Sequence, residues 1–310
     1  MIVNNPSTIL KILNDSRFIA PDYMQPGMKN LEVLNSVIQS TPLPLEGEQL
    51  KTIRREYIKI ISKRYEHIVL SLEKSNIHNF FDQNSLNTKK QYDLVENWLK
   101  PVVESVMSLM VDDKSLDSIF DELWDLPTLL DVSTSPGVRI KHAEIISSFL
   151  QKKGHKDSST MYQKIGLFLT GSNSILSTLA HSTIAAIESS GSVGENERIL
   201  DTGLKNLHRI ATSEVLIDGE LIKPMRQIKL RMSSLKNSPL YEELGDSVFF
   251  APGRHICPGM RISRKLWKMC LPSINQLKSK GVKISHIKYR KYDKIFNLPV
   301  SIGVTFDDRY

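Results

Sequence analysis

One of the two cysteines in this chain, Cys257, lies in a short segment that could hold a metal-bound thiolate. Gly253 and Gly259 flank it, and a helix is predicted to begin just after it, near Met260. A helix N-terminus favours negative charge and offers unpaired N–H donors, so it lowers the cost of ionising the sulfur. The glycines allow a tight turn and the close approach of a flat ligand. This pattern favours a thiolate that binds the iron of a macrocycle such as haem.

Two neighbours of Cys257 have side chains that would complete such a site. Phe250 could shield the sulfur from water, and His255 could reach an anionic group at the edge of the ligand. The alternative is a free cysteine in an ordinary loop, because most unpaired cysteines are simply buried core residues. The number of constrained positions in the segment favours the thiolate.

The residues from Phe250 to Gly259 resemble the haem-binding loop of the cytochrome P450 family, which reads Phe-Gly-x-Gly-x-His/Arg-x-Cys-x-Gly. Only Ala251 departs from this pattern, since the family has glycine there. The resemblance implies a mainly α fold with small β-sheets, one haem b, and Cys257 as the axial ligand. It also implies a P450-like monooxygenase, in which the thiolate favours O–O cleavage and the haem supplies the oxidation chemistry.

A long helix predicted from Glu46 to about Glu73 contains a charge on its apolar face. Arg54 falls on the same face as Leu50 and Ile61, where a guanidinium needs an anion or must extend to the surface. Residues 46–55 are similar to the P450 helix whose arginine contacts a haem propionate, and Arg54 is the matching position. The resemblance gives Arg209 and His255 the same role.

Residues 165–187 contain no Asp, Glu, Lys or Arg, yet nine of them are polar. The segment is too polar for lipid, so we expect a helix buried within the protein. Residues 170–174 resemble the oxygen-activating kink of P450s, with Gly171 at the kink and with Asn173 and Ser174 at the positions of the acid and the alcohol. Ser174 can donate a hydrogen bond, whereas Asn173 cannot exchange protons as a carboxylate can. The alternative is that both side chains only bond to their own helix.

Other family features are weaker. Glu195 and Arg198 are spaced like the Glu-x-x-Arg pair of P450s, although their distance from Arg209 differs slightly. The chain is shorter than a typical member, so the lid and the proximal region are expected to be shortened. The losses are expected between Gly137 and Met161, and in the segment before Phe250.

The resemblance implies a single P450-like haem domain over residues 1–310. Its expected parts are a helical region (1–150), a central buried helix (160–188) and a region with the haem loop and the sheets (195–310). Residues 75–91 are expected to form a loop. In the last part we expect a hairpin over 215–222, a strand at 228–232, a helix from 257 to 277, and a strand over 298–306.

The composition restricts the cellular compartment and the classes of binding partner that we expect for this chain. Two cysteines give no disulfide framework, and we find neither a signal peptide nor a membrane span, so a cytoplasmic protein is expected. The net charge is +7, but the cations are spread out and no nucleic-acid motif is present. We therefore expect an acidic electron donor such as a ferredoxin or flavodoxin. Its docking surface would comprise Arg254, Arg261, Arg264, Lys265 and Lys268, although a solvated helix face would show the same pattern.

The expected substrate is a small or carrier-bound metabolite of a biosynthetic, secondary-metabolism pathway. Two alternative functions stay open at this stage. One is a peroxide-driven or non-oxidative haem-thiolate enzyme, an isomerase or dehydratase, because Asn173 weakens the proton relay. The other is a non-catalytic P450-derived protein that only binds a ligand or partner.

Overall fold

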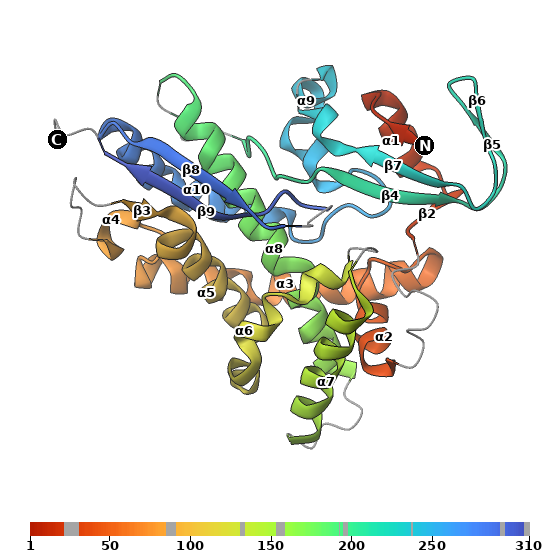
Figure 1. Ribbon diagram of the computed structural model, residues 1–310, viewed down its shortest axis with the longest axis horizontal. Coiled ribbons are helices and arrows are strands. Elements are labelled where there is room, and N and C mark those ends of the chain that lie inside the picture. Colours follow the sequence, from red (N-terminus) through yellow and green to blue (C-terminus); the bar gives the residue numbers. More distant parts are fainter. Residues whose placement is uncertain are drawn as a thin grey trace.

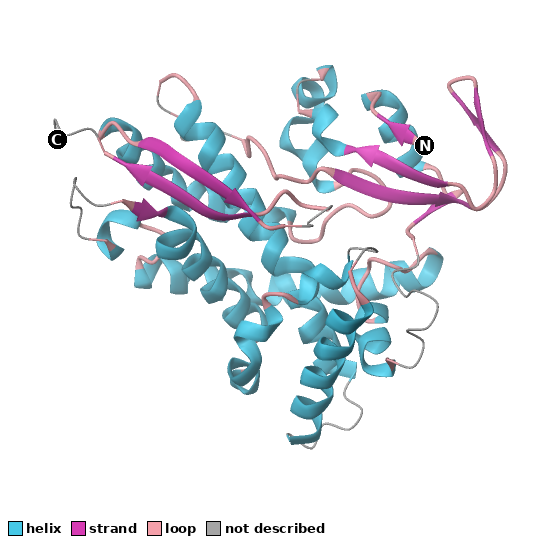
Figure 2. Ribbon diagram, viewed as in Figure 1, coloured by secondary structure: helices cyan, strands magenta, loops and turns pink. Residues whose placement is uncertain are grey.

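The computed structural model describes residues 1–21, 31–84, 91–130, 134–152, 159–191, 193–194, 198–236, 238–291 and 295–306. Helices dominate, with two small sheets and one hairpin (Figure 2). The helices are α1 (Pro6–Asn14), α2 (Glu32–Gln39), α3 (Gly47–Ser75), α4 (Phe80–Gln83), α5 (Lys100–Val111), α6 (Phe120–Leu123), α7 (Pro136–Lys152), α8 (Ser159–Glu188), α9 (Pro239–Leu244) and α10 (Met260–Ser279).

The long helix α8 forms the centre of the molecule. It runs obliquely through the ribbon, with one sheet on each side of its C-terminal half and with α2 and α6 near its N-terminal half (Figure 1). Almost every side chain from Ile165 to Ala186 is buried or half-buried. The prediction of a central buried helix is therefore confirmed, and α8 is longer than the uncharged stretch that indicated it.

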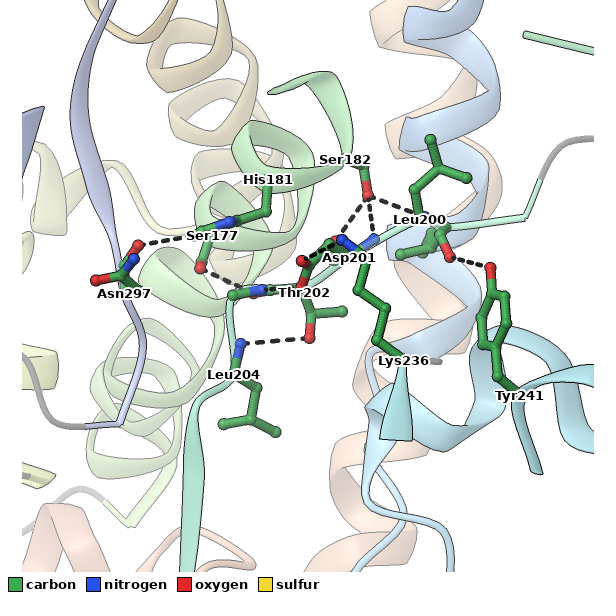
Figure 3. Close-up of polar contacts among 12 residues, drawn as sticks. Ser177, His181, Ser182, Leu200, Asp201, Thr202, Leu204, Lys236, Tyr241 and Asn297 are labelled. Atoms are coloured by element: carbon green, nitrogen blue, oxygen red, sulfur yellow. Dashed lines mark hydrogen bonds and ion pairs between the residues drawn. The ribbon is translucent and has the colours of Figure 1, made fainter. Parts of the chain in front are cut away.

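The polar residues of α8 are explained by the segment that lies beside it. Ser177 donates to the carbonyl of Thr202 at 2.8 Å, and Ser182 donates to the carbonyl of Asp201 at 2.7 Å (Figure 3). His181 contacts the Asn297 carbonyl through Nε2 at 2.7 Å. These side chains satisfy loop backbone groups that water cannot reach. They thereby fix the entry of the chain into strand β4, which borders the cavity described below.

Strands make two sheets and a hairpin, and strand order is β1-β7-β4-β2 in the first sheet and β3-β9-β8 in the second. The first sheet contains β1 (Ile2–Val3), β2 (Phe18–Ile19), β4 (Asn206–Ala211) and β7 (Gln227–Arg231), and only β1 and β7 are parallel. The second contains β3 (Tyr92–Asp93), β8 (Lys283–Tyr289) and β9 (Pro299–Thr305). The hairpin joins β5 (Val215–Ile217) to β6 (Glu220–Ile222). The predicted hairpin, the two predicted strands and the helix after Cys257 are thus confirmed.

Local sequence explains where two of the helices begin and end. Asn5 caps α1, because its side-chain oxygen accepts hydrogen bonds from the backbone N–H groups of Ser7 and Thr8, and Pro6 occupies the first turn. Helix α3 ends at Asn76, whose positive φ of 52° suits asparagine better than most residues. Helix α3 buries Leu50, Tyr57, Ile61 and other apolar residues on one face, as the sequence pattern predicts.

Between Gly137 and Met161, where the lid is expected to be shortened, the described residues form the 17-residue helix α7. One expectation for a connecting segment needs correction. The segment 75–91 contains the short helix α4, whose first residue, Phe80, packs at the edge of an aromatic group; residues 85–90 lie outside the described residues. In the part of the chain that the structure describes, no helix has the length and apolarity needed to cross a membrane.

Candidate functional site

The Cys257 loop is closed by its own backbone. A 3-10 turn over Gly245–Phe250 leads into it, and the N–H of Cys257 donates to the carbonyl of Phe250 at 2.9 Å. Helix α10 begins three residues after the cysteine, so Cys257 stands at a helix N-terminus, where the thiolate form is favoured. Its sulfur is not in a disulfide, and the side chain is half-buried at the wall of a cavity.

Gly253 is required by both backbone conformation and space. Its φ is +130°, which L side chains rarely adopt, and a Cβ there would lie 2.6 Å from the carbonyl oxygen of Leu13. Ala251 also has a positive φ, 51°, so it occupies the left-handed region at the position where the P450 pattern has glycine. The predicted role of Gly253 in the turn therefore has a specific cause, a close approach to helix α1.

Replacing Gly253 with alanine should destabilise the protein far more than the same change at Gly219. Gly219 also has a positive φ, 84°, but nothing lies within 4 Å of the Cβ it would gain. Only the conformational cost of roughly 1–2 kcal/mol applies to Gly219→Ala. Gly253→Ala adds a backbone clash, so we expect a loss of about 3 kcal/mol or more. Urea unfolding of both variants measures the difference, and equal losses would contradict the close approach to Leu13.

The surroundings of Cys257 favour the neutral thiol as long as no cation is bound to the sulfur. Burial raises the pKa of the Cys257 thiol above its ordinary value. The N–H groups of Gly259 and Met260 and the charge of Arg54 act in the opposite direction, but they do not outweigh the burial. A metal ion bound to the sulfur would supply the missing positive charge and deprotonate it.

The cavity in front of Cys257 has a volume of about 260 Å³ and a mostly apolar wall. Helix α3, helix α8, the Cys257 loop with the start of α10, and the segment that enters β4 form most of this wall. The polar side chains in the wall are Arg54, Tyr57, Thr170, Ser174, Thr178, Thr202, Asn206, His208, His255, Cys257 and Ser263. Among the described residues that line the cavity there is no Asp or Glu, so the positive charge of Arg54 meets no carboxylate there.

Arg54 is the strongest indication that the cavity takes an anion. Its side chain is half-buried, and Nη1 donates to the carbonyl of Arg254 at 3.4 Å. Its Nε is buried without any hydrogen-bond partner, and no carboxylate of the described residues pairs with the guanidinium. A partly buried cation without a counter-ion costs free energy, and a bound anion would offset that cost. The propionate groups of a haem would do so, and a mostly apolar wall beside a cysteine suits the rest of that ligand.

His255 lines the same cavity, but one of its ring nitrogens is already engaged. Its Nε2 lies 3.0 Å from Oε1 of Glu46, while Oε2 of Glu46 accepts from Nη1 of Arg254 at 2.9 Å. Burial would raise the pKa of Glu46, but the hydrogen bond from His255 and the nearby charges outweigh it and hold that pKa below its ordinary value. Glu46 is a residue that sequence reasoning missed, because it lies more than 200 positions from its partners.

Helix α8 contributes a row of hydroxyl groups. Thr170, Ser174 and Thr178 line the cavity at intervals of one helical turn, and Gly171 lies beside them. Each hydroxyl donates to a carbonyl of its own helix, as Ser174 does to Thr170 at 2.8 Å. Helix α8 is continuous from Ser159 to Glu188, so the kink expected near Gly171 does not interrupt it.

Asn173 is placed differently from Ser174. It is buried on another side of α8, does not line the cavity, and its Oδ1 has no hydrogen-bond partner. Two residues that the sequence did not single out, Tyr57 and Thr178, do line the cavity. Their positions on the inner faces of α3 and α8 could have been found from helical periodicity once Arg54 and Ser174 were placed.

No protein-family model matches the chain, and no curated protein matches it in sequence. Solved structures do match. P450BioI in complex with a hexadec-9Z-enoic acid-ligated acyl carrier protein is 15% identical, with a TM-score of 0.71 over 98% of this chain and 91% of that chain. Epothilone D-bound P450epoK is 12% identical, with a TM-score of 0.72 over 99% and 90%. CYP109B1 from Bacillus subtilis is 14% identical, with a TM-score of 0.67 over 98% and 93%.

The chain has the cytochrome P450 fold. The predicted fold class, mainly α with small β-sheets, is confirmed by these structures and by the order of the elements. In this P450 fold the loop after Phe250 and the N-terminus of α10 bring Cys257, Phe250, Gly259 and His255 to one end of the cavity.

Arg209 is not among the residues that line the cavity of this P450 fold. It is buried in strand β4, and its Nη1 donates to the carbonyl of its neighbour His208 at 2.8 Å. His208 lines the cavity instead, and its Nδ1 lies 3.0 Å from Nε2 of Gln227. The role of Arg209 as a propionate anchor stays a prediction, and His208 is a further basic side chain at that wall.

The Glu-x-x-Arg pair cannot be placed as a whole. Glu195 lies outside the described residues, and Arg198 is exposed and packs against Gly245, where a Cβ would lie 2.9 Å from its Nη1. A different ion pair connects the cysteine loop to the scaffold. Arg264 on α10 donates to both carboxylate oxygens of the buried Asp246, at 2.5 and 3.1 Å. This pair ties the turn before Phe250 to α10.

Four of the five cations expected at a docking surface have partners within the chain. Arg254 is turned inward to Glu46, Arg264 binds Asp246, Lys265 pairs with Glu73 at 3.2 Å, and Arg261 stacks over the ring of Tyr65. Unpaired cations occur instead along α3, at Arg55, Lys59 and Lys63, which are exposed and have no acidic partner among the described residues. Glu66 lies two helical turns after Lys59 on α3, and it faces Arg261 of α10. The row of α3 cations therefore adjoins the surface of α10.

Proposed function

We propose that the chain is a haem-thiolate oxidoreductase that oxidises a small molecule and binds haem b through Cys257. One observation carries the proposal: a free cysteine at a helix N-terminus opens onto a cavity whose Arg54 has no anionic partner among the described residues. The P450 fold supports it, since the solved structures match over nearly the whole chain. When bound, a haem would supply the oxidation chemistry, which a thiolate ligand would promote.

The residues of the chain bind and orient the reactants. Cys257 would bind the iron, Arg54 and His255 would hold the propionates, and Phe250 would keep water from the sulfur. Gly171 and Gly259 leave space for a flat ring. The hydroxyl of Ser174 can leave its own helix carbonyl to hold a proton or a substrate oxygen near the reacting centre. Asn173 would act only through a change of its present orientation.

Turnover assays test this function and separate it from its alternative. Haem-loaded protein should oxidise substrates with dioxygen and a ferredoxin or flavodoxin reductase system. The absence of a carboxylate among the described lining residues favours a second candidate, a peroxide-driven enzyme, because it leaves no acid to relay protons. Product formed with hydrogen peroxide but not with dioxygen and reductase would favour the second candidate. Haem binding without turnover under either condition would favour a binding protein.

The wall of the cavity indicates an uncharged, largely apolar substrate. Apart from Arg54 and the two histidines, which we assign to the cofactor side, its polar groups are hydroxyls, an amide and the cysteine thiol. A charged group placed there would lose its hydration without gaining an ion pair. P450BioI, which resembles this chain in fold, was solved with an acyl group on a carrier protein, and a carrier would likewise present an uncharged chain.

Uncharged ligands should bind more tightly than charged ligands of the same chain length. We expect dodecanol and methyl dodecanoate to shift the haem spectrum at concentrations roughly tenfold lower than dodecanoate, dodecyl phosphate or dodecylamine, a difference of about 1.4 kcal/mol. Titration of the haem-loaded protein by absorption spectroscopy measures each affinity. Tighter binding of a charged member than of the alcohol would contradict the proposed substrate class.

The electron donor should dock on the row of α3 cations rather than on the five residues first expected. If an acidic ferredoxin binds there, its rate of reduction should fall as salt rises, because exposed charges are screened. Reversing Lys59 and Lys63 to glutamate should slow reduction further, whereas reversing the paired Lys265 should change it less. Reduction that ignores both salt and these substitutions would rule the surface out.

A further inference from the structure

The part of the cavity wall that α8 forms contains three hydroxyl groups in a row. Thr170, Ser174 and Thr178 are four residues apart, so neighbouring members lie about 6 Å apart along the helix axis and on the same face. Thr170 and Ser174 are half-buried, and Thr178 is buried with 4% of its surface exposed. Because all three line one cavity, a ligand that lies along α8 meets them one after another.

Each of these hydroxyls uses its proton within the helix. Thr170 donates to the carbonyl of Gly166 at 2.9 Å, and Ser174 donates to the carbonyl of Thr170 at 2.8 Å. Thr178 donates to the carbonyl of Ser174 at 2.7 Å. A carbonyl oxygen has no proton to give, so the hydroxyl is the donor in all three bonds. Each hydroxyl oxygen keeps its lone pairs, which can accept a hydrogen bond from a ligand.

A ligand that donates a hydrogen bond and a ligand that only accepts one therefore interact differently with this wall. A ligand O–H or N–H can bond to a hydroxyl oxygen while the bond within α8 stays intact. A ligand that has only acceptors needs the hydroxyl proton, so the side chain must first leave its helix carbonyl. Threonine is stiff at χ1, and the bond to the carbonyl one turn earlier helps to fix its rotamer. The threonines of α8 thus favour ligands that donate.

The other uncharged polar groups of the wall do not reverse this preference. The hydroxyls of Thr202 and Ser263 and the amide of Asn206 can each donate or accept, so they can serve either kind of ligand. Tyr57 lines the cavity, but its hydroxyl donates to the carbonyl of Gln163 at 3.4 Å, and Gln163 is not a residue of the cavity wall. The balance between donors and acceptors is therefore set by α8.

We propose that the substrate is an uncharged, largely apolar molecule that carries a hydroxyl or another hydrogen-bond donor, and that Thr170 and Thr178 accept this hydrogen bond. The proposal rests on the proposed function, since it assigns the cavity to a substrate as well as to the cofactor. Ser174 is left out because serine lacks the second branch at Cβ, so its hydroxyl turns more easily to serve the reacting centre.

Octanol and methyl heptyl ether test the proposal, because they are isomers that share an oxygen acceptor but differ in the donor. Calorimetric titration of the haem-loaded protein measures both affinities. In the wild type we expect octanol to bind more tightly than the ether. In the double variant Thr170→Val with Thr178→Val, the ratio of the two affinities should fall roughly three- to tenfold, the range of one neutral hydrogen bond. The double variant Thr170→Ser with Thr178→Ser should keep the wild-type ratio, since both hydroxyls remain.

Thr183→Val is the matched control. Thr183 is also a buried threonine of α8, but it does not line the cavity, and its Oγ1 has no hydrogen-bond partner among the described residues. Its substitution should leave the affinity ratio unchanged. A ratio that stays the same in the double valine variant, or that falls equally in Thr183→Val, would overturn the proposal. An alcohol that bound only through the iron would also keep its advantage in the double valine variant, so the ratio separates the two causes.

The proposed function can fail separately from this proposal. Failure of the wild-type chain to take up haem would refute the haem-thiolate function. The same two titrations on the haem-free chain would still decide whether Thr170 and Thr178 favour a donor. A wild type that binds the ether more tightly than octanol, or that binds neither isomer, would overturn the proposed substrate class even if the haem is bound.

Discussion

Replacing Cys257 with alanine should abolish the red-shifted absorption of the reduced carbon-monoxide complex. That absorption requires a thiolate ligand, and among the described residues that line the cavity Cys257 is the one cysteine. Without the thiolate, any haem retained by Arg54 and His255 would be bound by a weaker ligand or by water. We therefore expect a complex that absorbs at shorter wavelength and a lower haem content. Difference spectra of the variant and the wild type measure both.

Cys270 provides the matched control. It is the other cysteine of the chain, lies within α10 and is only 1% exposed. Burial raises the pKa of its thiol to about 12, so it does not form a thiolate at neutral pH. Cys270→Ala should leave the spectrum unchanged. A normal spectrum for Cys257→Ala would refute the assignment of the axial ligand.

Replacing Arg54 with leucine should speed haem loss by roughly 10- to 100-fold, the equivalent of about 1.5–3 kcal/mol for a hydrogen bond to a charged group. The stability of the haem-free protein, in contrast, should not decrease. Its guanidinium has a buried Nε without a partner, so removal of the charge should not lower the free energy of unfolding. Transfer to apomyoglobin measures the first effect, and urea unfolding of the haem-free protein measures the second.

Arg55→Leu is the control for Arg54, because Arg55 is exposed one residue further along the same helix. Its substitution should leave haem loss unchanged and affect only electron-donor docking. Equal rates of haem loss for the two variants would show that the cavity charge does not serve an anionic cofactor. So would a haem-free Arg54→Leu protein that is much less stable than the wild type.

The sequence predicted the parts of the site that are local in the chain. Cys257, Gly253 and the start of α10 lie within one short segment, and the uncharged stretch of α8 identified the central helix without any knowledge of its partners. Arg54 was recognised because helical periodicity places a charge among apolar residues, and periodicity depends only on neighbouring positions.

The parts that the sequence did not predict depend on long-range contacts. Arg254 was expected on the surface, but Glu46 and the carbonyls of Asp15 and Phe18 draw it inward. No local pattern links these positions. Arg209 lies outside the cavity wall although the β4 residues from Asn206 to His208 line it, and strand alternation alone does not predict this difference. The orientation of Asn173 away from the cavity likewise follows from how α8 is rotated against its neighbours.

Eight solved structures that share this fold are between 11% and 16% identical to the chain. At that level the fold is retained through the pattern of buried positions, while residues at the site can differ. Ala251 lies in the left-handed region at the position where the P450 pattern has glycine, and the described residues that line the cavity include no carboxylate. These two features would affect the reaction that a bound haem carries out, whereas the cysteine loop would determine whether haem binds.

The most direct test of the central claim is the absorption spectrum of the purified, haem-reconstituted wild-type protein, reduced with dithionite under carbon monoxide. The account predicts one haem per chain and the red-shifted band of a thiolate-bound carbon-monoxide complex. Failure to retain haem, or a band at the wavelength of a histidine-bound complex, would contradict it.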